Sequence, residues 1–331
     1  GSTGYIGIQL IKLLVNHKFV KINHLCGNTS VGKKISFFDK SLSKKKLPII
    51  ERFNKNLLKK IDVIFTALPN GEAQLISNIL SKNQVLIDLA ADFRLKKASD
   101  YFKWYKKKHK AINNLKKSIY SLPELNGEKV KKYNIISCPG CYPTSILIPL
   151  VPLIKKDLIE TKNIIIDSKS GYSGAGRGVH QKYINDNLYE SLKAYGIATH
   201  RHNPEIEETL KKYTNKRIDF EFTPHLTPMF RGILSTIYLR LNNNTSYSKI
   251  VNTLFKNYKD SPFIKIFKKG KLLSTNDVIN TNNCYISINK TKNKKKIIIL
   301  SAIDNLIKGG AGQAIQNLNS KFNFPSKCGL K

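Results

Sequence analysis

Apolar runs alternate with helix-like stretches through the first 140 residues of the chain. The runs are FVKINHLCG (19–27), IDVIFTALP (61–69), QVLIDLA (84–90) and YNIISCP (133–139), and amphipathic segments separate them. Strands that alternate with helices in this way build a parallel sheet that is covered by helices on both faces. The pattern predicts an α/β, doubly wound domain of the Rossmann type.

The rhythm changes after residue 140. One amphipathic helix is expected at 246–258, and longer strand-like runs lie at 163–171, 217–226, 232–242, 284–290 and 295–304. Successive strands with few helices between them predict an α+β domain with an antiparallel or mixed sheet. We therefore expect two domains: one formed by 1–140 and completed by a C-terminal helix at 306–331, and one formed by 141–305.

The charge of the chain is strongly positive, at +35, but its distribution does not indicate nucleic acid as a partner. Only seven of the 57 basic residues are arginine, and the lysines are scattered through expected loops and helix faces. Such a pattern is typical of a solvated surface, although it can steer anionic substrates. The apolar stretches are shorter than a membrane span needs. Five irregularly spaced cysteines fit a reducing, cytoplasmic compartment better than a disulfide scaffold.

The chain opens with GSTGYIG, a G-x-x-G-x-x-G spacing that precedes the apolar stretch YIGIQLIKLLVNH. Glycines at this spacing let the backbone approach a pyrophosphate at the N-terminus of a helix, as in dinucleotide-binding domains. The strand that usually leads into such a loop is not present ahead of it, so we expect the chain to be incomplete at this end. The loop residues expected to bind the cofactor are Gly1, Ser2, Thr3, Gly4, Tyr5 and Ile6.

The segment after the second expected strand indicates which dinucleotide is bound. HLCGNTS contains no Asp or Glu that would hold a ribose 2′-hydroxyl. Asn28, Thr29, Ser30 and Lys33 instead offer donors and positive charge suited to a 2′-phosphate. The sequence therefore favours NADP over NAD, with Thr29 and Ser30 as the expected contacts.

The unit Cys138-Pro139-Gly140-Cys141 allows three interpretations. A redox pair would match a thioredoxin-like strand–C-x-x-C–helix order, but that motif belongs near the start of its fold. A zinc site would need a second ligand pair, and His200 and His202, one residue apart on an expected strand, would point to opposite faces. The remaining cysteines form no second C-x-x-C. No metal site is therefore expected.

The third interpretation is a single thiolate nucleophile at the start of a helix. Cys141 lies just before Pro143 and Thr144, where unpaired N–H groups and the helix dipole favour the thiolate. A base is then needed, and His202 is the better candidate of the two histidines because it lies closest to the expected helix cap at Asn203-Pro204. A thiol nucleophile together with a nicotinamide implies hydride transfer to or from a thioester.

Eight motifs, in order and over nearly the whole chain, resemble those of the N-acetyl-γ-glutamyl-phosphate reductases, a family of the semialdehyde dehydrogenase superfamily. The motifs are GSTGYIG (1–7), LIDLAADFRL (86–95), YSLPEL (120–125), CPGCYPT (138–144), SGYSGAGR (170–177), HRHNPEI (200–206), TPHLTPMFRGIL (223–234) and NLIKGGAGQAIQN (305–317). The resemblance implies an NADPH-dependent oxidoreductase of arginine biosynthesis. Its substrate would be an acyl phosphate, N-acetyl-L-glutamyl 5-phosphate, which is reduced to the 5-semialdehyde with release of phosphate.

The resemblance also implies a role for individual residues. Cys141 matches the nucleophile that forms the thioester, and His202 matches the acid/base, with His200 as its substitute or orienter. Cys138 is then incidental. Arg94, His200, Arg201 and Arg231 are candidates for substrate binding, although each arginine is equally well interpreted as part of a structural ion pair. Further cofactor contacts are implied for Ser173, Gly174, Ala175, Gly176, Asn305, Gly312 and Gln313.

The resemblance further implies a homo-oligomer, a dimer or tetramer, joined through the second domain. Two other functions remain open at the level of sequence. One is a carrier-linked aminoadipyl- or glutamyl-phosphate reductase of lysine biosynthesis, which the basic surface would suit because the carrier is acidic. The other is a non-catalytic, basic dinucleotide-binding protein, which would bind polyanions with a steep dependence on salt.

Overall fold

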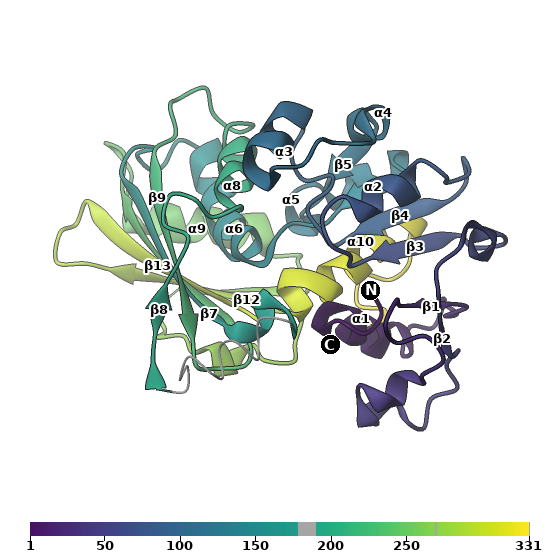
Figure 1. Cartoon of the computed structure of the whole chain (residues 1–331). Helices are drawn as coiled ribbons and strands as arrows, with labels where there is room; N and C mark the ends of the chain where they lie inside the picture. The colour runs from purple at the N-terminus through teal and green to yellow at the C-terminus, as the bar shows by residue number, and fades with distance from the viewer. Residues whose placement is uncertain (178–189, 269, 331) are drawn as a thin grey trace. The chain divides into compact units, whose positions relative to one another are not determined.

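The computed structural model describes residues 1–177, 190–268 and 270–330, and these divide into two units. Unit 1 comprises residues 1–140 and 310–331, and unit 2 comprises residues 141–309. Figure 1 labels their helices and strands. Each unit is described by itself.

The core of unit 1 is a four-stranded parallel sheet in the order β3-β4-β6-β5. Its central strand β4 has the sequence VLID and is buried at every position, as a strand covered on both faces should be. The parallel sheet predicted for the first 140 residues is therefore confirmed. The strands are β3 (Val63–Thr66), β4 (Val85–Asp88), β5 (Ser118–Tyr120) and β6 (Ile135–Ser137).

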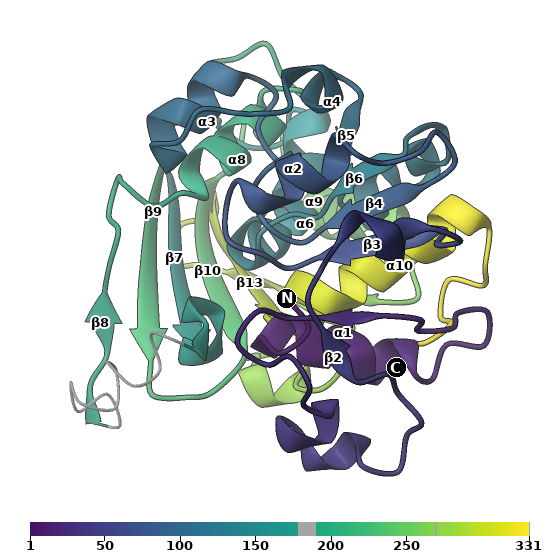
Figure 2. The ribbon, with the colours of Figure 1, turned by 45° about the vertical axis from the view of Figure 1, so that its right-hand side comes forward.

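Helices of unit 1 cover this sheet on both sides. In Figures 1 and 2, α2 and α10 lie on opposite sides of the β3–β4 part of the sheet. Helix α10 contacts β4 and also α1, whose buried face is apolar. A separate two-stranded parallel sheet joins β1 (Leu25–Cys26) to β2 (Ile50–Glu51). The helices are α1 (Tyr5–Leu14), α2 (Glu72–Ser77), α3 (Ala98–Tyr105), α4 (Ile112–Lys116), α5 (Pro123–Asn126) and α10 (Gly312–Phe322).

Two buried carboxylates lie at the carboxyl end of β4 and just beyond it. Asp92 accepts hydrogen bonds from the N–H groups of Gly71 and Ala73 and from the side chains of Gln74 and Tyr101, so its charge is well compensated. Asp88 is fully buried and has fewer partners, Thr66 Oγ1 at 2.7 Å and the N–H of Ala90 at 3.1 Å. Burial, assisted by the negative charge of Asp92, raises the pKa of Asp88 to about 6.

We expect Asp88→Asn to change how the stability of the protein depends on pH. Because the folded-state pKa of Asp88 is above its unfolded value of 3.8, the folded protein holds a proton that the unfolded chain releases. Its contribution to the free energy of unfolding is complete below about pH 4 and is lost as pH rises through about 6, a change of roughly 3 kcal/mol. The asparagine variant, isosteric with the protonated acid, lacks this loss.

Urea denaturation of both proteins between pH 4 and 7.5 measures the difference. Asp88→Asn should gain stability over the wild-type protein as pH rises and keep a constant advantage above pH 7. Asp62→Asn, which removes an exposed carboxylate just before β3, is the matched control for the loss of one acidic side chain. A stability difference for Asp88→Asn that does not vary with pH would contradict the expected titration.

Unit 2 is built on a seven-stranded sheet in the order β11-β12-β13-β10-β7-β9-β8. The pairs β7–β9 and β11–β12 are parallel and the other four are antiparallel, so the mixed sheet predicted for the second domain is confirmed. Residues 291–295 connect the antiparallel strands β12 and β13. The strands are β7 (Ile164–Gly171), β8 (Lys193–Ala194), β9 (Phe220–Thr227), β10 (Ile233–Arg240), β11 (Ile264–Phe267), β12 (Cys284–Lys290) and β13 (Lys296–Ile303).

Three helices of the described part of unit 2 lie on one face of this sheet, as Figures 1 and 2 show: α6 (Cys141–Lys155), α8 (Asn203–Leu210) and α9 (Tyr247–Tyr258). Helix α6 is buried from Tyr142 to Ile154 and contacts β10, β13, α8 and α9. Its Ser145 hydroxyl lies 2.7 Å from that of Ser235 on β10, which lies 2.7 Å from that of Ser168 on β7. These buried hydroxyls fix α6 to the two central strands.

Short helical turns complete the described chain. They are η1 (Ile35–Phe37), η2 (Lys40–Leu42), η3 (Lys55–Leu58), η4 (Gly127–Lys132), η5 (Tyr172–Ala175), η7 (Thr275–Asp277) and a π-helical turn, η8 (Ile307–Ala311). Within residues 1–177, 190–268 and 270–330, none of the helices has the length and apolar composition needed to cross a membrane.

Candidate active site

Cys141 is the first residue of α6, a helix that is buried from Tyr142 to Ile154. Its side chain is partly exposed, whereas Cys138 is fully buried. Burial raises the pKa of the Cys138 thiol to about 12, so Cys138 stays protonated at neutral pH. The two cysteines of the CPGC unit therefore differ, because only Cys141 combines a helix start with access to solvent.

Side chains of unit 1 hold the main chain just before Cys141. Arg94 donates from Nε to the carbonyl of Cys138 at 2.9 Å and from Nη2 to the carbonyl of Leu89 at 3.0 Å. Gln313 on α10 donates from Nε2 to the carbonyl of Pro139 at 3.1 Å. Sequence reasoning assigned Arg94 to the substrate and Gln313 to the cofactor. The structure shows both side chains bonded to the turn that leads to Cys141.

Beside Cys141, the Tyr142 ring lies against both candidate histidines. Its ring centroid is 5.5 Å from that of His200 and 5.9 Å from that of His202, each in an edge-to-face arrangement. The Tyr195 hydroxyl donates to the Tyr142 hydroxyl at 3.2 Å, and the Tyr195 ring also contacts His200. Unit 2 therefore brings both histidines next to the residue that follows the thiol.

The two histidines differ in their chemistry. The Nδ1 atom of His200 accepts a hydrogen bond from the backbone N–H of His202 at 3.1 Å, so any proton on the neutral His200 ring is on Nε2. Burial, assisted by the positive charge of Arg201, lowers the pKa of His200 to about 4. His200 is therefore neutral at physiological pH and positions the backbone of His202. His202 remains the candidate acid/base.

The expectation that His200 and His202 lie on a strand and point apart is wrong. Residues 199–202 form a turn, because Gly196 adopts a left-handed conformation and α8 begins at Asn203 with Pro204 in its first turn. The turn brings the two imidazole rings to a centroid distance of 4.7 Å. Even so, no group of three or more His, Cys, Asp or Glu side chains in the described part of the chain is arranged to hold a metal ion.

The glycine loop of unit 1 brings main-chain atoms into close approach ahead of α1. A Cβ atom at Gly1 would lie 2.2 Å from the carbonyl oxygen of Ala67, and one at Gly7 would lie 2.1 Å from the carbonyl oxygen of Gly1. Glycine is thus required at both positions. The N-cap of the ten-residue helix α1 is Gly4, which has no side chain to bond the first N–H groups of the helix. No acidic residue lies in the first turn of α1. These features fit an anionic pyrophosphate at the N-terminus of α1.

Some of the other residues in the loop region bond to the protein, and others face solvent. The Ser2 side chain donates to the carbonyl of Cys26 at the end of β1, at 2.9 Å. Thr29 is exposed, but Ser30 is 2% exposed, and its hydroxyl faces Gly27, where a Cβ atom would lie 2.3 Å away. Of the two expected 2′-phosphate contacts, Thr29 therefore faces solvent and Ser30 does not.

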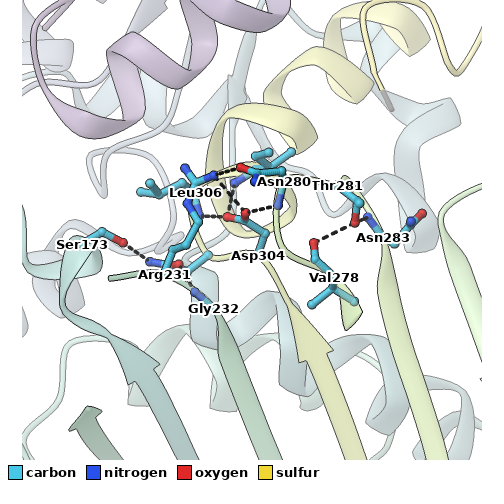
Figure 3. Close-up of polar contacts among 11 residues, drawn as sticks. Ser173, Arg231, Gly232, Val278, Asn280, Thr281, Asn283, Asp304 and Leu306 are labelled. Atoms are coloured by element: carbon cyan, nitrogen blue, oxygen red, sulfur yellow. Dashed lines mark hydrogen bonds and ion pairs between the residues drawn. The ribbon is translucent and has the colours of Figure 1, made fainter. Parts of the chain in front are cut away.

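The second glycine turn, Ser173–Gly176, lies in unit 2 after β7. The carbonyl of Phe230 accepts from the N–H of Ser173 at 2.9 Å. Asn305 donates to Ser173 Oγ at 3.0 Å and accepts from the N–H of Gly232 at 2.7 Å. The Arg231 side chain lies 3.3 Å from the carboxylate of Asp304, as Figure 3 shows. Asn305 and Arg231, expected at the cofactor and the substrate, thus both bond to neighbouring protein groups.

Three residues of these clusters were missed by sequence reasoning. Tyr142 and Tyr195 have no distinguishing sequence signal apart from the position of Tyr142 in CPGCYPT, and Asp304 follows a strand like many other polar residues. The candidate Arg201 is exposed, and Gly312 is buried at the start of α10. Arg177, at the end of the SGYSGAGR motif, is exposed, and the residues that follow it lie outside the described ranges.

Comparison with known proteins extends these observations. Residues 1–133 match the family model of the semialdehyde dehydrogenase NAD binding domain, and residues 141–305 match that of the semialdehyde dehydrogenase dimerisation domain. The chain is 42% identical to the N-acetyl-gamma-glutamyl-phosphate reductase of Desulforamulus reducens, over 100% of this chain and 96% of the relative. The identity and coverage are the same for the enzyme of that name from Clostridium kluyveri. A protein named as a probable chloroplastic enzyme of this kind in Arabidopsis thaliana is 38% identical, over 100% of this chain and 82% of its own length.

Solved structures show the same fold at lower identity. Aspartate semialdehyde dehydrogenase II of Vibrio cholerae, complexed with ASA, aligns with a TM-score of 0.69 at 17% identity over 98% of this chain and 96% of its own. The aspartate semialdehyde dehydrogenase of Candida albicans with NADP aligns with a TM-score of 0.68 at 17% identity, over 98% of each chain. The predicted two-part architecture is confirmed by these likenesses.

Proposed function

Because this chain belongs to the N-acetyl-γ-glutamyl-phosphate reductase family of semialdehyde dehydrogenases, we propose that it reduces N-acetyl-L-glutamyl 5-phosphate to N-acetyl-L-glutamate 5-semialdehyde. The reaction consumes NADPH, releases phosphate and is a step of arginine biosynthesis. The observation that carries the proposal is the position of Cys141, at the start of α6 and next to Tyr142, whose ring contacts both histidines.

Cys141 acts as the nucleophile in this proposal. Its thiolate attacks the acyl carbon of the substrate, a C–S bond forms, and the bond from carbon to the phosphate oxygen breaks, so that phosphate leaves. The N-terminus of α6 stabilises the thiolate and the negative charge that develops on the acyl oxygen. Forming a thioester separates the loss of phosphate from the reduction, and each step then has a lower barrier than a concerted one.

The cofactor, when bound, supplies the hydride that converts the thioester carbonyl to a thiohemiacetal. His202 protonates the thiohemiacetal oxygen and takes the proton back when the C–S bond breaks, which releases the aldehyde and regenerates the Cys141 thiolate. His200 holds the His202 backbone in place through its Nδ1 acceptor. Arg94 and Gln313 fix the turn that precedes the thiol.

NADP is the proposed cofactor. The glycine loop, with Gly4 at the start of α1, would hold the pyrophosphate, and Thr29 with Lys33 would contact the 2′-phosphate. The lack of an acidic residue in HLCGNTS supports NADP over NAD. Ser173–Gly176 would lie beside the nicotinamide, because its backbone allows close approach. Arg201, which is exposed, is the arginine that we propose for the substrate carboxylate.

We further propose that the protein is a cytoplasmic homo-oligomer. The match of residues 141–305 to a dimerisation domain supports self-association through unit 2. Light scattering after size exclusion would measure the molar mass, and a monomer at micromolar concentration would contradict this part of the proposal.

The function is tested by following NADPH oxidation with N-acetyl-γ-glutamyl phosphate as the substrate. We expect one phosphate released for each NADPH oxidised, and a kcat/KM for NADH at least about tenfold lower than for NADPH. The reverse reaction, with the semialdehyde, phosphate and NADP+, avoids the labile acyl phosphate. β-Aspartyl phosphate and a carrier-linked glutamyl phosphate are the comparison substrates. Faster turnover of either one, or no turnover of any, would contradict the proposal.

A further inference from the structure

The turn after β13 is held by a fully buried carboxylate, Asp304. Its Oδ1 atom accepts from the N–H groups of Leu306 at 2.9 Å and Ile307 at 3.2 Å, so the side chain closes the turn that follows it. Its Oδ2 atom accepts from the N–H of Asn280 at 2.8 Å. Figure 3 shows these contacts converging on Asp304 from two parts of unit 2.

Arg231 supplies the opposite charge. Its Nη1 atom lies 3.3 Å from Asp304 Oδ2, and the arginine side chain is 14% exposed. The same Nη1 atom donates to the side-chain oxygen of Asn280. A buried carboxylate is stable only when it is paired and hydrogen-bonded. Asp304 meets both conditions. Removing its negative charge would take the counter-charge away from the largely buried guanidinium of Arg231.

Asn305 fixes the same turn in another direction. It joins the N–H of Gly232 to the hydroxyl of Ser173, so both ends of its amide are bonded to the protein. A Cβ atom built on Gly174 would lie 3.5 Å from the amide nitrogen of Asn305. Two consecutive side chains therefore connect residues 304–305 to the residues just before β10, to Asn280 and to the turn Ser173–Gly176.

The far end of this turn reaches the candidate nucleophile. The N–H of Gly309 donates to the carbonyl of Asp304 at 3.0 Å, which closes the segment as a compact unit. A Cβ atom built on Gly309 would lie 2.6 Å from Cys141 Cβ and 3.1 Å from Cys141 Cα. Gly309 is thus in contact with Cys141, and a displacement of the turn by a fraction of an ångström would displace Cys141 or open a gap beside it.

We propose that Asp304 is a positioning residue for the Cys141 thiol, with Arg231 as its counter-ion. The carboxylate fixes the turn 304–309, and the turn presses Gly309 against Cys141 and so sets the place of the sulfur at the start of α6. This proposal rests on the proposed function, in which Cys141 is the nucleophile. It assigns Arg231 to the support of the thiol.

The test uses Asp304→Asn in the full chain, which keeps the shape of the side chain and removes its charge. We expect kcat to fall about 100-fold, because misplacement of a reacting group by about 1 Å has an effect of this size, while the KM for NADPH stays within about twofold. The second readout is alkylation of Cys141 by iodoacetamide, followed by mass spectrometry of its peptide at several pH values. We expect its rate constant to change more than fivefold.

Three further variants keep the test decisive. Glu160→Gln removes an exposed ion pair with Arg240 in the same unit and should change neither readout. Leu254→Ala, at a fully buried position of α9, lowers the stability of unit 2 without changing residues 304–309 and should leave the alkylation rate unchanged. Gly309→Ala presses on Cys141 directly and should reproduce the alkylation change with the Asp304–Arg231 pair intact; it replaces Asp304→Asn in the test if that variant does not fold.

An alkylation rate in Asp304→Asn within twofold of the wild-type value, or equal to that of Leu254→Ala at matched thermal stability, would overturn the proposal. An unchanged rate in Gly309→Ala would overturn it too, because the turn would then have no effect on the thiol. Alkylation requires no substrate. A wild-type protein that fails to reduce the acyl phosphate would refute the proposed function alone, whereas unchanged alkylation refutes the positioning role alone.

Discussion

Replacing Cys141 with serine is expected to lower kcat for N-acetyl-γ-glutamyl phosphate by about 1,000-fold or more, because a serine hydroxyl at this place cannot form the acyl-enzyme intermediate at a useful rate. The KM for NADPH should change little, because the substitution only replaces one sulfur atom with an oxygen atom at the start of α6. Steady-state NADPH oxidation and acid-quench trapping of the thioester on the Cys141 peptide are the two measurements.

Cys138→Ser is the matched control, three residues away in the same CPGC unit. Cys138 is fully buried, and its raised pKa keeps it protonated, so it has no means of attacking the substrate. We expect activity within about threefold of the wild-type level, with some loss of stability because the Asn317 amide donates to the Cys138 sulfur. Activity that survives in Cys141→Ser but disappears in Cys138→Ser would show that the other sulfur is the nucleophile.

His202→Asn should produce the second largest loss, about 100- to 1,000-fold in kcat, since general acid–base catalysis contributes on this scale. The loss should be in kcat more than in the KM for NADPH, because His202 is proposed to act on the thiohemiacetal and not on the cofactor. The measurement is kcat at saturating substrate between pH 5.5 and 8.5 for the wild-type protein and the variant. A kcat for His202→Asn within tenfold of the wild-type value at every pH in this range would rule out His202 as the acid/base.

The same substitution at His200 separates the two histidines. Asparagine places an oxygen near the position of the imidazole Nδ1, so His200→Asn retains the acceptor for the His202 N–H while it removes the ring contacts with Tyr142 and Tyr195. We expect at most about a tenfold loss in kcat and an unchanged pH profile, because His200 with a pKa of about 4 is already neutral throughout this range. A larger loss at His200 than at His202 would reverse the two roles.

The architecture was predictable because it depends on burial patterns that recur along the chain. The run VLID is apolar at three successive positions and ends in a carboxylate, and the structure places it as a central strand buried on both faces. In unit 2, β7 alternates buried and more exposed residues from Ile164 to Ser170, which is the pattern of a strand with helices on one face only. Patterns of this kind are local, and so they can be interpreted without knowledge of the fold.

The roles of the charged residues were less predictable, because they depend on partners far away in the sequence. Arg231 looks like a substrate ligand when only its neighbours in TPHLTPMFRGIL are considered, and its buried partner Asp304 is 73 residues away. Arg94 likewise bonds to a carbonyl 44 residues further along the chain. The turn at His200–His202 was taken for a strand because the left-handed conformation of Gly196, which bends the chain back, leaves no periodic signal in the sequence.

Three buried serines form a chain of hydrogen bonds with a fixed direction: Ser145 on α6, Ser235 on β10 and Ser168 on β7. Ser145 Oγ donates its only proton to the carbonyl of Tyr142 at 2.9 Å, so Ser235 must donate to Ser145, and Ser168 must in turn donate to Ser235. All the O–H dipoles therefore point toward the first turn of α6, where they reinforce one another. Alanine at position 168 would shorten this aligned series by one member. Alanine at position 145 would instead leave the two remaining hydroxyls able to reverse, and neutron diffraction would detect that loss of proton order.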